Sequence, residues 1–169
     1  MPTKPTKRSD IPPRNSDNYK RRLLDPLTPQ DTQLLIQCVN YKGSPKHKQN
    51  PHLFGLAAFN GKRGDETLCD SHAGFTPKKM LNVSMLIQRG ITASLVGVRM
   101  FWTVADDGWI FEARLTNSID HEYHGYPVRP TEAIAEPVAK RFYEWAHAKG
   151  SSIEQNAAQT CYLLYGFRL

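Results

Sequence analysis

The sequence predicts a single α+β domain with a mainly antiparallel sheet and helices packed on one face of it. Three observations carry this prediction. An Asp-Gly turn at 106–108 separates two runs of β-branched and aromatic residues, and helical periodicity occurs at 76–89 and at 130–148. With 169 residues, 40% of them hydrophobic, the chain has enough apolar material for one core.

Residues 1–18 are expected to form a disordered tail, and residues 19–169 the domain. The tail is rich in proline and basic residues and offers almost nothing to bury. After it, residues 19–27 predict a short helix. Thr28 and Pro29 are typical of a helix start, but the apolar run that follows also fits a buried strand. We favour a turn followed by a strand at 34–41.

The next predicted helix covers residues 76–89, after a loop at 41–55, a turn at 60–65 and a short strand at 67–70. Thr76 can cap this helix and Pro77 takes its first position. Its apolar side chains recur at helical spacing, and Gly90 stands where a helix commonly ends.

The hairpin has strands at 98–104 and 109–115. In its second strand Glu112 and Arg114 alternate with apolar residues, which predicts a sheet with one wet or functional face. Residues 116–129 are interpreted as a polar, aromatic loop.

The last elements are a helix at 130–148 and a terminal strand at 161–167. Pro137 predicts a kink or break in the helix, and Gly150 its end. Among the classes of partner, the net charge of +6 and the pI of about 9.3 favour an anionic one such as nucleic acid, unless the charge only aids solubility.

Three widely spaced cysteines exclude a disulfide framework and favour a reducing cytoplasm. The sequence has no apolar run of membrane-spanning length and no apolar segment of a secretory signal near its start.

The most informative stretch for function is the loop at 41–55, which holds lysines and histidines and no acidic residue. In Lys46-His47-Lys48 the flanking charges are expected to lower the pKa of His47, so that it is a neutral base near pH 7. Metal-free RNA cleavage needs such a base, a cation for the phosphate and an acid for the leaving oxygen. The acid could be His124, supported by Tyr123 and Tyr126, or His121. The alternative is that His47 is a solvated surface imidazole.

These arguments give two sets of candidate residues, and no cofactor is expected. The candidate catalytic residues are Lys46, His47, Lys48, His124 and Tyr126. The candidate nucleic-acid-binding residues are Lys42, Ser44, Lys62, Arg63, His121 and Tyr123, with the tyrosines available to stack on unpaired bases.

Two alternative sites involve cysteine. Cys69, His72, His121 and His124 form two x₂-spaced pairs of zinc-type ligands, although we assign no metal site. Cys69, Asp70 and His72 could instead serve a small enzyme that acts on a nucleotide or a peptide.

The segment Lys46-His47-Lys48 followed by Phe54-Gly55 resembles the colicin D-like branch of the barnase/EndoU/colicin/RelE (BECR) ribonuclease superfamily. The resemblance covers about fifteen residues, and either His47 or His52 matches the family's catalytic histidine. It implies metal-independent cleavage of tRNA or another structured RNA. It also implies a bacterial toxin or defence module with a neutralising partner protein.

A second interpretation gives the chain no catalytic role. It would be a nucleic-acid-binding or adaptor subunit of a larger complex, docked through its basic tail and aromatic hairpin.

Overall fold

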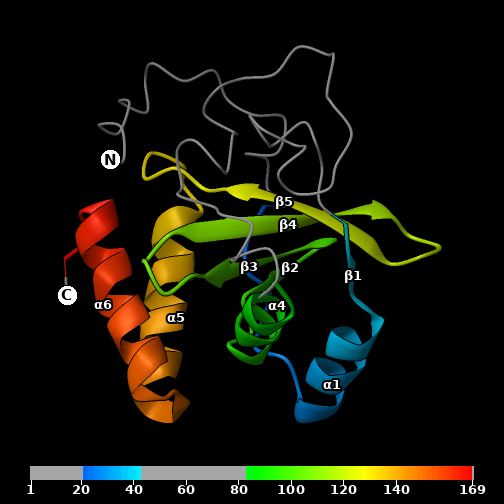
Figure 1. Cartoon of the computed structure of the whole chain (residues 1–169), viewed down its shortest axis with the longest axis horizontal. Helices are drawn as coiled ribbons and strands as arrows, with labels where there is room; N and C mark the ends of the chain where they lie inside the picture. The colour runs from blue at the N-terminus through cyan, green and yellow to red at the C-terminus, as the bar shows by residue number, and fades with distance from the viewer. Residues whose placement is uncertain (1–20, 43–82, 169) are drawn as a thin grey trace.

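A computed structural model describes residues 21–42 and 83–168 of the chain. In this part the helices are α1 (Pro29–Cys38), α4 (Val83–Thr92), α5 (Ala135–Lys149) and α6 (Ser152–Tyr165), and the strands are β1 (Asn40–Tyr41), β2 (Val96–Gly97), β3 (Met100–Val104), β4 (Ile110–Asn117) and β5 (Glu122–Pro127). The strands form one sheet in the order β1-β5-β4-β3-β2, in which only the β1–β5 pair is parallel (Figure 1). The predicted α+β class with a mainly antiparallel sheet is confirmed.

The predicted hairpin is confirmed as β3 and β4, paired in antiparallel register. Its turn closes through Ala105, whose N–H donates to Trp109 O at 2.9 Å and whose carbonyl accepts from Gly108 N at 2.9 Å. Gly108 has a φ of +86°, which a residue without Cβ adopts at little cost. The Asp-Gly signal therefore located the turn correctly.

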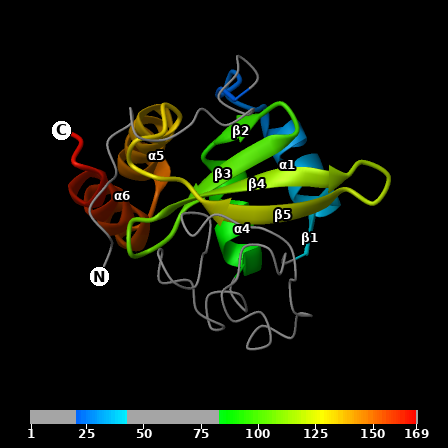
Figure 2. The same ribbon diagram turned by 90° about the horizontal axis from the view of Figure 1, so that it is seen from above.

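Side chains on the two sides of the strands contact different helices. Phe101 and Ala113, which are register partners, pack with Ile91 of α4 and with side chains of α1. Trp102 and Ile110 alternate with them along the strands and pack with α5 and α6. The helices that we expected on one face thus contact both sets of side chains, and Figure 2 shows α5 and α6 side by side at one end of the sheet.

On the side of β4 that carries Glu112, this residue is not exposed to solvent. Glu112 has no exposed area, and neither has Ile110 on the same side of the strand. The expectation of a solvated face is wrong there, because α5, α6 and Arg21 cover it.

Gly90 lies inside α4 and does not end it, which corrects the predicted helix end. The helix continues to Thr92. A Cβ on Gly90 would lie 2.0 Å from Trp102 O, so the glycine allows α4 to approach the backbone of β3. The predicted start of this helix, at 76–82, lies outside the described residues.

The helix start at Thr28 is correct and the strand favoured at 34–41 is wrong for most of its length. The Thr28 hydroxyl accepts from Asp31 N at 3.1 Å, and Pro29 takes the first helical position. The apolar residues Leu35 and Ile36 form the packed face of α1, and the strand is reduced to Asn40–Tyr41. The short helix expected before Thr28 is also absent over residues 21–27, which the structure describes.

Residues 116–129 contain a strand, β5, where a loop was expected. A tight turn leads into it, because the side-chain oxygen of Asn117 accepts from Ile119 N at 2.9 Å and His121 adopts a φ of +49°. The tight turn returns the chain directly along β4 as its antiparallel partner.

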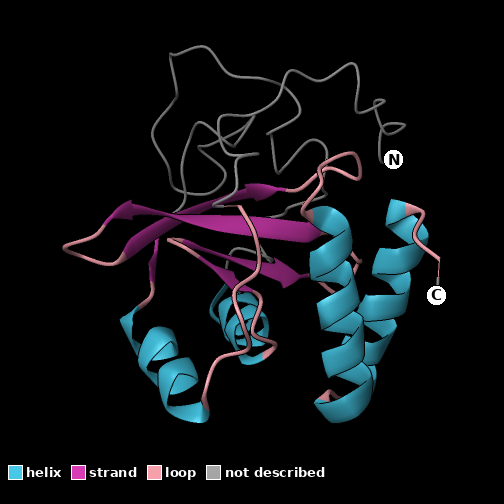
Figure 3. Cartoon of the chain, turned by 180° about the vertical axis from the view of Figure 1, so that it is seen from behind, coloured by secondary structure: helices cyan, strands magenta, loops and turns pink. Residues whose placement is uncertain are grey.

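The chain from Ala135 onward forms two packed helices (Figure 3). Because α5 begins at Ala135, Pro137 falls in its first turn and neither kinks nor breaks it, and Gly150 ends the helix as predicted. The strand expected at 161–167 is wrong. Those residues continue α6, which begins with a capping box of Ser151 and Glu154 and ends at Gly166, with φ of +72°.

No helix in residues 21–42 and 83–168 is long and apolar enough to cross a bilayer. The predicted tail at 1–18, the turn at 60–65 and the strand at 67–70 lie outside these ranges.

Candidate functional site

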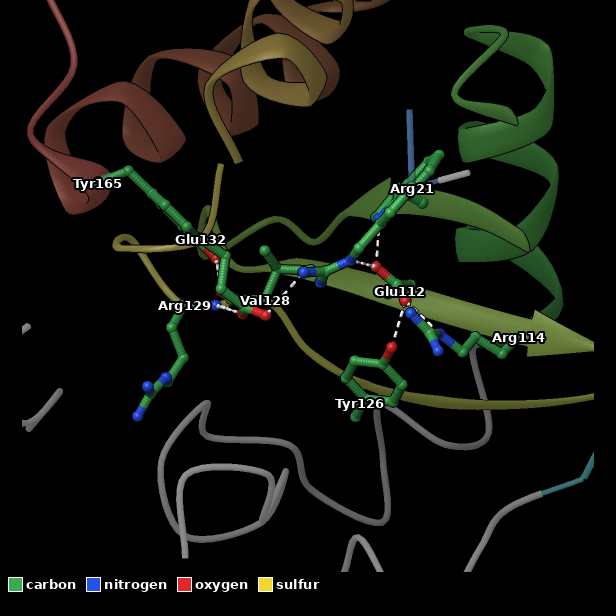
Figure 4. Close-up of polar contacts among 9 residues, drawn as sticks. Arg21, Glu112, Arg114, Tyr126, Val128, Arg129, Glu132 and Tyr165 are labelled. Carbon is green, nitrogen blue, oxygen red and sulfur yellow. Dashed lines mark hydrogen bonds and ion pairs between the residues drawn. The ribbon is translucent and has the colours of Figure 1, made fainter. Parts of the chain in front are cut away.

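The site is built around a buried carboxylate, Glu112, in the middle of β4 (Figure 4). Its Oε2 accepts from Arg21 Nε at 2.7 Å and from Trp102 Nε1 at 2.8 Å. Its Oε1 accepts from Arg114 Nε at 2.6 Å and from the Tyr126 hydroxyl. Each carboxylate oxygen therefore has two donors, an arrangement that stabilises the ionised form.

Burial alone raises the pKa of Glu112, but the charges of Arg21 and Arg114 and the hydrogen bond from Tyr126 outweigh it and hold the pKa below its ordinary value. Burial and the nearby Glu112 carboxylate raise the pKa of Tyr126 well above its ordinary value. The Tyr126 hydroxyl is thus protonated near pH 7 and donates to Glu112. In this structure it supports the carboxylate.

Arg21 links this carboxylate to a second one. Its NH1 lies 3.0 Å from Oε1 of Glu132, whose Oε2 accepts from Arg129 N at 2.5 Å. Both arginine and carboxylate are buried, so the ion pairs fix residue 21 against the sheet. The N-terminal end of the described chain is therefore held beside the site.

The less buried part of the site is Arg114 with His124. They are register partners on β4 and β5, so their side chains leave the sheet on the same side as Glu112. Both are half-buried. The Thr116 hydroxyl lies 2.5 Å from His124 Nδ1, and Arg114 Cζ lies 5.7 Å from the centre of the Tyr126 ring. A rigid strand pair thus presents a guanidinium beside an imidazole whose one ring nitrogen is held by a hydroxyl.

Other predicted site residues lie elsewhere. Tyr123 leaves β5 on the opposite side, where it is buried with its ring centre 5.1 Å from that of Phe101, so it cannot stack on a base. His121 is exposed in the β4–β5 turn. Lys42 is exposed after β1, and its N–H donates to Tyr123 O at 2.8 Å. Of the candidates that the structure describes, only His124 and Tyr126 come together, with their ring centres 6.5 Å apart.

The remaining candidates lie outside the described residues. They are Ser44, Lys46, His47, Lys48, His52, Lys62, Arg63, Cys69, Asp70 and His72. The zinc alternative therefore has only His121 and His124 within the described part, which contains no group of three His, Cys, Asp or Glu side chains placed to hold a metal ion.

Arg114 and Arg21 were not among the sequence candidates. Alternation along β4 had placed Glu112 and Arg114 on one side, which was a usable signal for Arg114. No local pattern connects Arg21 to Glu112, because 91 residues separate them.

The chain was also compared with known proteins. No family model, no curated protein and no solved structure matches it.

Proposed function

We propose that the chain is a metal-independent ribonuclease in which His124 transfers a proton and Arg114 binds the scissile phosphate. The observation that carries this proposal is the pairing of Arg114 with His124 on one side of the β4–β5 strands. Arginine matches the planar, bidentate geometry of a phosphate, and histidine is the side chain that exchanges protons near neutral pH.

The proposed reaction is an internal transesterification. The ribose 2′-oxygen attacks phosphorus, the bond from phosphorus to the 5′-oxygen breaks, and a 2′,3′-cyclic phosphate and a 5′-hydroxyl result. A base removes the proton of the 2′-hydroxyl and an acid protonates the 5′-oxygen. We assign these transfers to His124 and to His47 of the loop at 41–55, with Lys46 and Lys48 on the phosphate.

The Glu112 cluster has a supporting part in this proposal. Glu112 receives Arg114 Nε at 2.6 Å, which fixes the orientation of the guanidinium. Thr116 does the same for the imidazole through its contact with Nδ1, and we assign the proton transfer to Nε2. Such fixed orientation lowers the cost of arranging the groups in the transition state.

The biological setting follows from the resemblance to BECR ribonucleases. We infer a cytoplasmic toxin or anti-phage defence effector that cuts tRNA or another structured RNA. A protein that neutralises it, or a scaffold, would then be its partner.

The test incubates purified protein with total tRNA in EDTA. We expect the wild-type protein to cut and to leave 2′,3′-cyclic phosphate ends, and His124→Ala to cut roughly 10²- to 10⁴-fold more slowly, the usual contribution of a general acid or base. His147→Ala is the matched control, because His147 is an exposed histidine of α5 that stacks on Tyr143.

Failure of the wild-type protein to cut any RNA would contradict the proposal, as would equal rates for the two variants. Loss of cutting in EDTA would favour the zinc alternative instead.

A non-catalytic nucleic-acid-binding subunit is the second candidate function. The observation that favours it is the Tyr126 hydroxyl, which donates to Glu112 and so is not available as an acid or base. This function predicts that the protein binds RNA and leaves it intact.

A further inference from the structure

A basic pocket of about 450 Å³ lies between the first turns of α5 and the segment that precedes α1. Its lining includes four cationic side chains, Arg21, Arg22, Lys140 and Arg141, and one carboxylate, Glu144. Neither the cleavage chemistry nor the sequence candidates use this pocket.

The charge of the pocket is not compensated. Arg21 is paired with Glu112 and Glu132. Within the described ranges, Arg22, Lys140 and Arg141 form no ion pair with a carboxylate. Glu144 therefore opposes three cations, and the pocket has a net positive charge that favours an anionic ligand.

Arg141 is held in place by neutral groups. Its NH1 donates to Leu24 O at 2.6 Å and to Ser94 O at 3.0 Å. Carbonyl acceptors orient the guanidinium and leave its charge available, whereas a carboxylate would neutralise it. The first turn of α5, with Ile134 and Pro137 in the lining, adds the positive end of a helix of 15 residues.

The pocket and the candidate site share Arg21. This side chain lines the pocket and donates to Glu112, which also holds Arg114 on the same side of β4 (Figure 4). The pocket and the candidate site are therefore connected through one buried ion-pair network.

We propose that the pocket binds backbone phosphates of the same RNA strand, away from the scissile bond. This inference rests on the proposed ribonuclease function, since it supplies a second contact for that substrate. Because the contacts are to phosphate, they add affinity without selecting a sequence. The pocket would help the enzyme to hold a structured RNA longer than the few nucleotides at the scissile bond.

The test measures binding of a fluorescein-labelled single-stranded 12-nucleotide RNA by anisotropy, in a His124→Ala background whose slowed cleavage leaves the RNA intact during the measurement. In Arg22→Gln/Lys140→Gln we expect affinity to fall about tenfold at moderate salt. The slope of log K against log salt should shrink by about 1.4, because each contact with single-stranded phosphate contributes about 0.7. Both side chains differ from Arg141 in making no hydrogen bond within the described part of the chain. If the double variant folds poorly, each single variant can replace it.

Lys149→Gln/Arg168→Gln is the control, with the same change of charge at exposed positions outside the pocket. Equal affinity and equal salt slope in the two double variants would overturn the inference, whatever the cleavage test shows. Weaker binding by the pocket variant alone supports it. If that result appears while the wild-type protein cuts no RNA, the proposed function fails and the pocket remains a phosphate site.

Discussion

Glu112 shows how one residue determines the chemistry around it. A carboxylate with no exposed area is unfavourable by itself, and here four donors offset the cost of its burial. In return it orients Arg114, which lies in the less buried part of the site. The carboxylate is thus a positioning residue in the proposed mechanism, and its first measurable effect is on stability.

Glu112→Gln is expected to lower the free energy of unfolding at pH 7 by about 3 kcal/mol, because it removes one of the two charge partners of the buried Arg21. Urea unfolding measures this loss. Glu136→Gln, at an exposed position of α5, is the control and should change stability by less than about 0.5 kcal/mol.

The difference in stability between the wild-type protein and Glu112→Gln is expected to depend on pH, with a definite sign. The folded-state pKa of Glu112 lies below its ordinary value of 4.5. Its contribution is therefore complete above pH 4.5 and is lost as the pH falls through the lowered folded-state pKa. The gap between wild-type and Glu112→Gln stability should narrow in acid. A gap that stays constant down to pH 3 would contradict a lowered pKa of Glu112 in the folded state.

At the scale of elements, local sequence signals correctly predicted the turns and helix starts that local interactions determine. The hairpin turn depends on Gly108 and the start of α1 on Thr28, and both were found from the sequence. Residues 161–167 are apolar enough for a strand, but the capping box at Ser151 starts a helix that continues to Tyr165. That box follows the S-x-x-E pattern, so this error missed a local signal. The other errors lie where tertiary contacts decide.

The candidate site was predictable only in part, for a similar reason. His124 and Tyr126 were expected in a loop and lie on β5, because the Asn117 turn returns the chain along β4. The register of β5 with β4 then places His124 beside Arg114, and it places Tyr123 on the opposite face of the sheet. Pairing between strands cannot be derived from composition alone, since it depends on which strand is adjacent.

The contact between α4 and β3 gives a prediction at this scale. In an ordinary helix, Gly→Ala is stabilising by about 1 kcal/mol. At Gly90 the new methyl group would lie 2.0 Å from Trp102 O, so Gly90→Ala is expected to destabilise by about 3 kcal/mol as α4 is displaced from the sheet.

Thermal or urea unfolding measures the effect of Gly90→Ala, and Ser84→Ala, at an exposed position of the same helix, is the control. A stable Gly90→Ala variant would mean that α4 does not approach β3 this closely.

At the scale of the whole molecule, the sheet separates two apolar clusters. One joins α5 and α6 to Trp102 and Ile110, and the other joins α1 and α4 to Phe101 and Ala113. The first cluster also contains Cys161, and burial there raises the pKa of its thiol to about 12, so it is not a nucleophile at neutral pH. The Arg114–His124 pair lies nearer the β4–β5 turn and away from this cluster.

The Tyr165 hydroxyl connects α6 to the sheet by hydrogen bonds. Removing this hydroxyl tests whether the described elements unfold as one unit. The hydroxyl donates to Val128 O at 2.5 Å and accepts from Ile110 N at 3.0 Å, both in buried surroundings. Tyr165→Phe leaves this donor and this acceptor without partners and should lower the free energy of unfolding by about 2 kcal/mol. Tyr162→Phe is the matched control, since Tyr162 is a half-buried tyrosine one turn away in α6.

The expected result is a lower urea midpoint with an unchanged dependence on urea, because the loss should be felt by the whole cooperative unit. Hydrogen exchange should then speed up equally in α6 and in β4. Faster exchange confined to α6 would show that this helix opens by itself, and that the sheet with its Arg114–His124 pair is stable without it.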